Sequence, residues 1–237
     1  MLDTLEKPIQ KNSPLTAEAA EIQLQEDIAD LLDNPYAFVM YVFDWGVGDL
    51  KDEAGPDEWQ TKILKYIGAN ILTLQQALQI AMRSGTETGK TALIAWLILW
   101  YMSTRKDPRI VVTANTGSQL STKTWAELAK WHKLSINRHW HTWTATKFYN
   151  NNNPETWFAV ATPWSLENTQ AFAGTHAKYV LMIFDESSEI PDKIWEVAEG
   201  AATKPGHLWI VFGNPSMNTG RFAECFKKYR HRWYCME

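Results

Sequence analysis

Cysteine is scarce in this chain of 237 residues, which contains only Cys225 and Cys235. Their spacing gives neither a zinc motif nor a disulfide framework, and such low use of cysteine suits a reducing compartment. Long hydrophobic runs are missing too, because the longest, residues 92–102, is too short to cross a bilayer. The N-terminus carries no apolar signal segment. We therefore expect a soluble, intracellular protein without membrane contact.

Neither sign of charge is in large excess, since 23 Lys and Arg stand against 27 Asp and Glu, for a net charge of −4. This excludes a protein whose whole surface is basic, so any contact with nucleic acid must be a local patch. Hydrophobic residues make up 45% of the chain and charged residues 21%, which is typical of a globular domain with a sizeable core.

Residues 81–96, with the sequence AMRSGTETGKTALIAW, resemble a phosphate-binding loop. Gly89, Lys90 and Thr91 match its Gly-Lys-Ser/Thr end, whereas the first glycine position holds Ser84 and Gly85 comes one residue late. An apolar strand before the loop and a helix from Lys90 to about Met102 supply the context that such a loop requires. A turn of small residues that merely caps a helix is the alternative.

This loop predicts binding of ATP through backbone N–H groups and the N-terminus of the following helix. Lys90 would add a mobile cation, and Thr91 a hydroxyl ligand for Mg²⁺. The predicted nucleotide-binding residues of the loop are Ser84, Gly85, Thr86, Glu87, Thr88, Gly89, Lys90 and Thr91. Glu87 is unexpected, because a carboxylate beside a triphosphate is costly unless it points away or pairs with a cation. Arg83 could be that cation, or could reach the γ-phosphate itself.

Two acids follow an apolar strand at residues 180–184. A magnesium–triphosphate site needs a carboxylate at the C-terminal edge of a parallel sheet, and Asp185 is the predicted metal ligand together with Thr91. Glu186 would orient and deprotonate the attacking water. Because a nucleotide kinase does not need the second acid, the pair favours hydrolysis coupled to movement. Acids that simply end a surface strand are the alternative.

The remaining pattern alternates strands and helices between residues 75 and 214, and the strands are almost wholly apolar. This predicts an α/β fold with a mostly parallel sheet and helices on both faces. The amide of Gln60 could read the adenine edge, although a plain helix-surface glutamine is the alternative. Asn214 ends a strand and could sense the γ-phosphate. Residues Thr113, Asn115 and Gln119 follow or end the second strand and could link nucleotide state to a bound polymer.

Basic residues gather in two segments that also contain aromatic side chains. The first carries Lys123, Lys130, Lys133 and Arg138, and the second carries Lys227, Lys228, Arg230 and Arg232. Either could bind a phosphate backbone, or could be a solvated helix face. A neighbouring subunit could also supply an arginine to the site. The candidates are Arg105, Arg109, Arg138 and Arg221, and the sequence does not choose among them.

These motifs and their order (Trp59-Gln60, the loop to Thr91, TANTGSQ, IFDE and FGNP) resemble the large terminase subunit of tailed bacteriophages over about residues 35–237. The resemblance implies a RecA-like P-loop NTPase of the additional-strand type, which uses ATP and Mg²⁺ to drive double-stranded DNA into a capsid. Lys90 and Thr91 match its Walker A motif, and Asp185 and Glu186 its Walker B motif. Asn214 matches the coupling motif and Gln60 the adenine motif. The catalytic residues expected on this basis are Arg83, Lys90, Glu186 and Asn214.

The resemblance also implies partners and a domain order. The partners are DNA, the portal protein, the small terminase subunit and further copies of the chain, which would form a ring when active and be monomeric in isolation. The expected location is the host cytoplasm, with transient docking on the procapsid. We expect a leader and amphipathic helix at residues 1–35, the ATPase domain at 36–220, and the start of a connection to a missing nuclease domain at 221–237. No nuclease activity is therefore expected. A helicase-like ATPase and a nucleotide-binding module without turnover are the alternatives.

Overall fold

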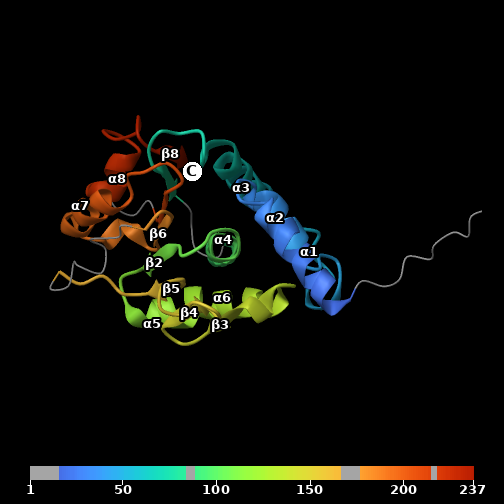
Figure 1. Cartoon of the computed structure of the whole chain (residues 1–237). Helices are drawn as coiled ribbons and strands as arrows, with labels where there is room; N and C mark the ends of the chain where they lie inside the picture. Colours follow the sequence, from blue (N-terminus) through green and yellow to red (C-terminus); the bar gives the residue numbers. More distant parts are fainter. Residues whose placement is uncertain (1–15, 84–88, 167–176, 215–217) are drawn as a thin grey trace, which may run out of the picture.

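The computed structural model describes residues 16–83, 89–166, 177–214 and 218–237 (Figure 1). Its strands form one sheet in the order β3-β4-β5-β2-β6-β7-β1-β8. The strands are β1 (Leu78–Arg83), β2 (Arg109–Thr113), β3 (His141–Trp143), β4 (Lys147–Asn150), β5 (Phe158–Ala161), β6 (Val180–Phe184), β7 (Leu208–Gly213) and β8 (Tyr234–Met236).

Parallel pairing runs through the sheet from β8 to β5, and only the pairs β3–β4 and β4–β5 at one edge are antiparallel. Strand β7 lies between β1, which leads toward the loop at Gly89, and β6, which leads to Asp185. This additional strand and the mostly parallel sheet confirm the predicted fold class.

Helices cover both faces of the sheet, also as predicted. They are α1 (Ala17–Ala29), α2 (Pro35–Val42), α3 (Glu58–Asn70), α4 (Lys90–Thr104), α5 (Gly117–Gln119), α6 (Trp125–Leu134), α7 (Asp192–Ala201) and α8 (Arg221–Cys225). One core cluster joins the sheet to α2, α3, α4 and α6, and a second joins its other face to α7 and α8. Figure 1 shows α7 and α8 on one side of the strands and α4 on the other, with α1 to α3 in a row beyond it.

Burial on both faces explains the continuous apolar runs in the sequence. Along β1, Ile80 and Met82 belong to the cluster around α4, whereas Ala81 between them belongs to the cluster around α7. Helix α4 lies between the sheet and helices α1, α2 and α6, so all its residues from Leu93 to Met102 are buried. A helix buried all round has no polar face, which is why this segment shows no amphipathic pattern.

The ends of the described chain pack on this core. Helix α1 begins after Thr16, whose hydroxyl accepts a hydrogen bond from the N–H of Ala19 at 3.2 Å. At the other end, α8 and β8 lie within the predicted connection, and Met236 of β8 is paired with Met82 of β1. A nuclease domain beyond this segment stays a prediction of the resemblance. None of the helices in the described ranges is long and apolar enough to cross a membrane.

Candidate functional site

A cleft of about 600 Å³ lies at the C-terminal edge of the sheet, where β6 and β7 end and α4 begins. The predicted site residues that line it are Gly89, Lys90, Thr91, Asp185, Glu186 and Asn214. They come from segments far apart in the sequence and meet because parallel strands present their C-terminal ends at one edge. The cation at position 90 and the two acids therefore face one space, as the sequence analysis requires.

Gly89 starts α4 in a conformation that favours glycine, with φ at 74° in the left-handed region. Its carbonyl accepts a hydrogen bond of 2.9 Å from Nε2 of Gln60, and the Oε1 of Gln60 accepts one of 2.8 Å from the N–H of Asp57. Gln60 is only 3% exposed. In the structure its amide therefore ties the end of the loop to α3, and its contact with adenine stays a prediction.

The remaining residues of the predicted site are the loop before Gly89 and Arg83. Residues 84–88, which include the predicted contacts Ser84, Gly85, Thr86, Glu87 and Thr88, lie outside the described residues. The guanidinium of Arg83 forms an ion pair of 2.9 Å with Glu237 and lies over the ring of Phe226 at 3.9 Å. Its catalytic role stays a prediction, while the structure shows it holding the C-terminal segment.

Asp185 is oriented by hydrogen bonds to both of its carboxylate oxygens. The hydroxyl of Thr124 donates to Oδ2 at 2.8 Å, and the N–H of Glu186 donates to Oδ1 at 3.0 Å. Thr124 is 1% exposed and is absent from the sequence prediction. The one sequence feature that could have indicated this role is the position of Thr124 in the helical segment after β2, because such a segment begins near the C-terminal edge of the sheet.

Glu186 has a positive φ of 54°, which is uncommon for a residue other than glycine and is often found at functional sites. Burial raises the pKa of its carboxyl group, and the negative charge of Asp185 raises it further, while Lys123 and Lys90 act in the opposite direction. A carboxylate with a raised pKa is a better proton acceptor than an ordinary surface glutamate. This environment suits a general base.

Two serines tie the segment after the acids to the end of β7. Ser187 donates a hydrogen bond of 2.7 Å to the carbonyl of Phe212, and Ser188 donates one of 2.7 Å to the carbonyl of Asn214. Between these carbonyls, Gly213 leaves no room for a side chain: an added Cβ would lie 2.6 Å from Phe222 and 2.7 Å from Oγ of Ser188. The position of Asn214 is thus fixed by the same segment that carries Glu186.

Asn115 makes a second link, from the end of β2. Its Nδ2 donates to Glu189 at 2.5 Å, and its Oδ1 accepts from the indole of Trp164 at 3.2 Å. A hollow of about 260 Å³ beside the main cleft is lined by Asn115, Gln119, Glu186 and Asn214, among others. The segment TANTGSQ therefore lies next to the acids, although its link to a bound polymer stays a prediction.

The first basic segment lies partly in the cleft. Lys123 and Lys130 are among the residues that line it. From the sequence alone, this segment could either bind a phosphate backbone or be a solvated helix face, because a count of charges does not show which side of a helix faces the sheet edge.

Two of the four arginine candidates for a site in a neighbouring subunit are held within this chain. Arg105 is 2% exposed and donates to the carbonyl of Leu32 at 2.8 Å, so it is not available to a neighbouring subunit. Arg221 is paired with Glu199.

The donor groups fit magnesium. Within the described ranges, no group of three His, Cys, Asp or Glu side chains could hold a metal ion. Mg²⁺ commonly takes only one or two protein ligands and completes its shell with water and substrate phosphates. Thr91 and Asp185 both line the cleft, and their hydroxyl and carboxylate groups are oxygen donors of the required kind.

Fold and site together define a RecA-like P-loop domain of the additional-strand type, and known proteins agree with this class. No family model matches the chain. A curated protein of Enterobacteria phage P7, described as "Probable terminase, large subunit", is 23% identical over 191 residues, which cover 78% of this chain and 37% of that protein. The predicted resemblance to the large terminase subunit is thereby confirmed.

Solved structures show the same fold. The large terminase of bacteriophage HK97 aligns with a TM-score of 0.59 and 20% identity, over 86% of this chain and 43% of that protein. A mutant ATPase domain of the Thermus phage P74-26 large terminase aligns with a TM-score of 0.53 and 14% identity, over 77% of this chain and 74% of that protein. The large terminase of the thermophilic bacteriophage D6E, in complex with ADP, aligns with a TM-score of 0.53 and 17% identity, over 66% of this chain and 39% of that protein. The chain spans less than half the length of the P7 and HK97 proteins.

Proposed function

We propose that this chain hydrolyses ATP in the cleft at the sheet edge and is the motor domain of a DNA-packaging terminase. The observation that carries the proposal is the convergence of Lys90, Asp185 and Glu186 on one cleft, with Asn214 beside them. The likeness to large terminases supports the coupling to DNA. On this proposal the active form is a ring of several copies, docked on a procapsid in the host cytoplasm through the portal protein, with the small subunit as a further partner.

Each group would have a separate task. Lys90 binds the phosphates, and Thr91 and Asp185 hold Mg²⁺, which when bound neutralises phosphate charge. Glu186 accepts the proton of the attacking water. The carbonyl and backbone of Asn214 are fixed to Ser188, so its amide is held at the end of β7, where it can respond to the γ-phosphate.

Phosphate release is the direct test, measured with and without double-stranded DNA over a range of protein concentrations. We expect Mg²⁺-dependent hydrolysis that Lys90→Ala removes, because the phosphates lose their mobile cation. A rate that rises steeply with concentration would support catalysis in an assembly. Tight ATP binding without phosphate release at any concentration would instead identify a binding module, and strand separation would favour the helicase-like alternative.

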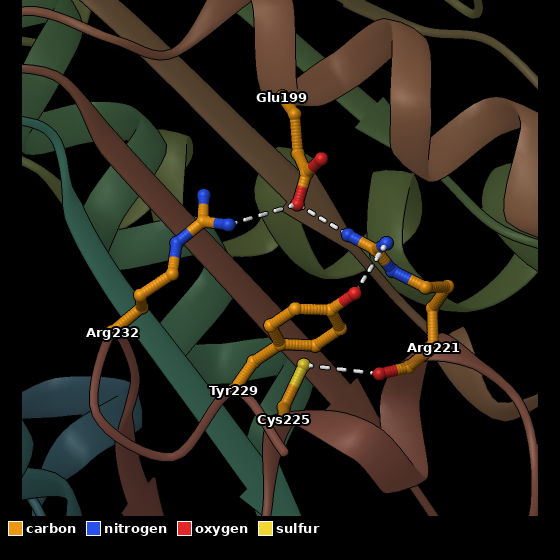
Figure 2. Close-up of polar contacts among 5 residues, drawn as sticks. All are labelled: Glu199, Arg221, Cys225, Tyr229 and Arg232. Atoms are coloured by element: carbon orange, nitrogen blue, oxygen red, sulfur yellow. Dashed lines mark hydrogen bonds and ion pairs between the residues drawn. The ribbon is translucent and has the colours of Figure 1, made fainter.

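The surface for DNA is best sought in the C-terminal basic turn, residues 227–232, between α8 and β8. Figure 2 shows how this turn is held: Glu199 on α7 pairs with Arg221 and with Arg232, the latter at 3.5 Å, around the ring of Tyr229. Lys228 and Arg230 are exposed, and neither has a carboxylate partner among the described residues. Lys228 lies over the ring of Tyr229 at 5.0 Å and keeps its charge exposed. A turn that presents exposed cations suits the evenly charged backbone of a duplex.

Salt-dependent DNA binding tests this surface. Replacing both Lys228 and Arg230 with alanine should weaken binding to duplexes of any sequence, because backbone charge carries no sequence information. The slope of log affinity against log salt concentration should fall by about 2, since each phosphate contact contributes about 0.9. The matched control changes Lys51 and Lys62, two exposed lysines elsewhere, and should leave the slope unchanged. Equal slopes in both double variants would exclude the basic turn as the DNA surface.

A further inference from the structure

Lys123 occupies an unusual place in the backbone. It lies in a π-helical segment, Leu120–Thr124, where the N–H of Trp125 bonds to the carbonyl of Leu120. Single π turns inside α-helices are rare and are found disproportionately at functional sites. This turn has a visible effect here. It places the buried Thr124 against Asp185, and it leaves the neighbouring Lys123 exposed on the wall of the nucleotide cleft.

Of the other cations in the cleft, one already has a carboxylate partner. Lys130, two turns further along the helix, pairs with Glu127 at 3.4 Å, and Glu127 also accepts a hydrogen bond from the indole of Trp131 at 2.8 Å. Lys123 has no salt-bridge partner within the part of the chain that the structure describes. Its ammonium group is therefore available to a ligand in the cleft.

The charge balance of the cleft shows what that ligand would gain. The acids of the lining are Glu127, Asp185 and Glu186, and its cations are Lys90, Lys123 and Lys130. The charges of these six side chains sum to zero, so without Lys123 the lining would carry a net charge of −1. An anionic triphosphate would then enter an acidic cleft, which is unfavourable even when a metal ion neutralises part of its charge.

We infer that Lys123 is a second phosphate-binding cation of this site and that it binds the γ-phosphate of ATP. The assignment rests on the proposed function. Lys90 begins α4 beside the loop, whereas Lys123 approaches from the segment that also holds Asp185, so the two cations reach the phosphates from different elements. Because Lys123 would contact the terminal phosphate, it would favour ATP over ADP.

Binding without turnover tests this role. Calorimetry on the whole chain, with Mg²⁺, would compare ADP with a non-hydrolysable ATP analogue. We expect Lys123→Ala to weaken binding of the analogue by about tenfold, as for the loss of one charge-assisted contact, and binding of ADP by less than about twofold. Lys123→Arg should keep most of the preference for the analogue, because it keeps the charge. The matched control is Lys133→Ala, which removes an exposed lysine of the helix that follows this segment, outside the lining of the cleft, and should leave the two affinities unchanged.

The outcomes separate this inference from the proposed function. If Lys123→Ala weakened the binding of ADP and of the analogue equally, or weakened neither, the role of Lys123 would be overturned while the ATPase proposal stayed in place. A wild-type chain that binds neither nucleotide would overturn both. Unfolding temperatures of the three variants should match the wild type, because both lysines are exposed; if Lys123→Ala were unstable, Lys123→Gln, which keeps more of the side chain, would replace it in the same comparison.

Discussion

Glu186→Gln should reduce the rate of ATP hydrolysis by about 10²- to 10⁴-fold, the usual contribution of a general base. Glutamine has nearly the same shape as glutamate, but its amide cannot accept the proton of the attacking water. Binding of ATP should persist, because Lys90, Thr91 and Asp185 remain in place. Phosphate release and nucleotide affinity, measured on the same preparation, would show the expected separation of catalysis from binding.

Glu196→Gln is the matched control for this change. Glu196 is an exposed acid on α7 that forms a surface ion pair of 3.3 Å with Lys193, and pairs of this kind contribute little to stability. Its substitution should leave both hydrolysis and binding unchanged. Normal hydrolysis by Glu186→Gln would refute the assignment of the base, whatever the control shows.

Gly213→Ala should destabilise the fold by about 1–3 kcal/mol, the range found for overpacked cores. The new methyl group would meet the ring of Phe222 at 2.6 Å and the hydroxyl of Ser188 at 2.7 Å, and neither can move freely. Ser188 donates a hydrogen bond to the carbonyl of Asn214, so a displacement of Ser188 should also move Asn214 in the cleft. Chemical denaturation would give the stability change, and the rate of phosphate release would report the effect on the site.

Gly200→Ala provides the contrast within the same protein. Gly200 lies inside α7, and a Cβ added there meets nothing within 4 Å. Because glycine is less favourable than alanine in a helix, this substitution should stabilise the chain by about 0.5–1 kcal/mol. Equal stability of the two variants would contradict the expected clash of a methyl group at position 213 with Phe222 and Ser188.

Much of the fold follows from sequence patterns whose physical basis is local. Strands β1, β6 and β7 are apolar runs bounded by turn residues, and α4 is fixed by the loop before it. Strands β3 and β8 were not predicted. Each has only three residues, HTW and YCM, and exists because a neighbouring strand offers it hydrogen bonds. No pattern in so short a segment can reveal such a partner.

The site divides in the same way. Lys90, Asp185, Glu186 and Asn214 were predictable because each directly follows a strand or starts the helix after one, and such positions share the C-terminal edge of a parallel sheet. Thr124 was not, since its partner Asp185 is 61 residues away in the sequence. Ser187 and Ser188 were not predicted for the same reason, because the carbonyls that they contact on β7 and after it are distant in the sequence. Their roles come from tertiary contacts, and serine and threonine are common in sequences without any such role.

Strand β7 acts as a spacer. With neighbouring strands about 4.8 Å apart, the interposed strand sets β1 and β6 roughly 9.6 Å apart. The segment that leads to Lys90 and the segment that carries the two acids therefore leave the sheet on either side of a third strand end. Asn214 follows that strand, so any group that enters the cleft between Lys90 and the acids also faces Asn214.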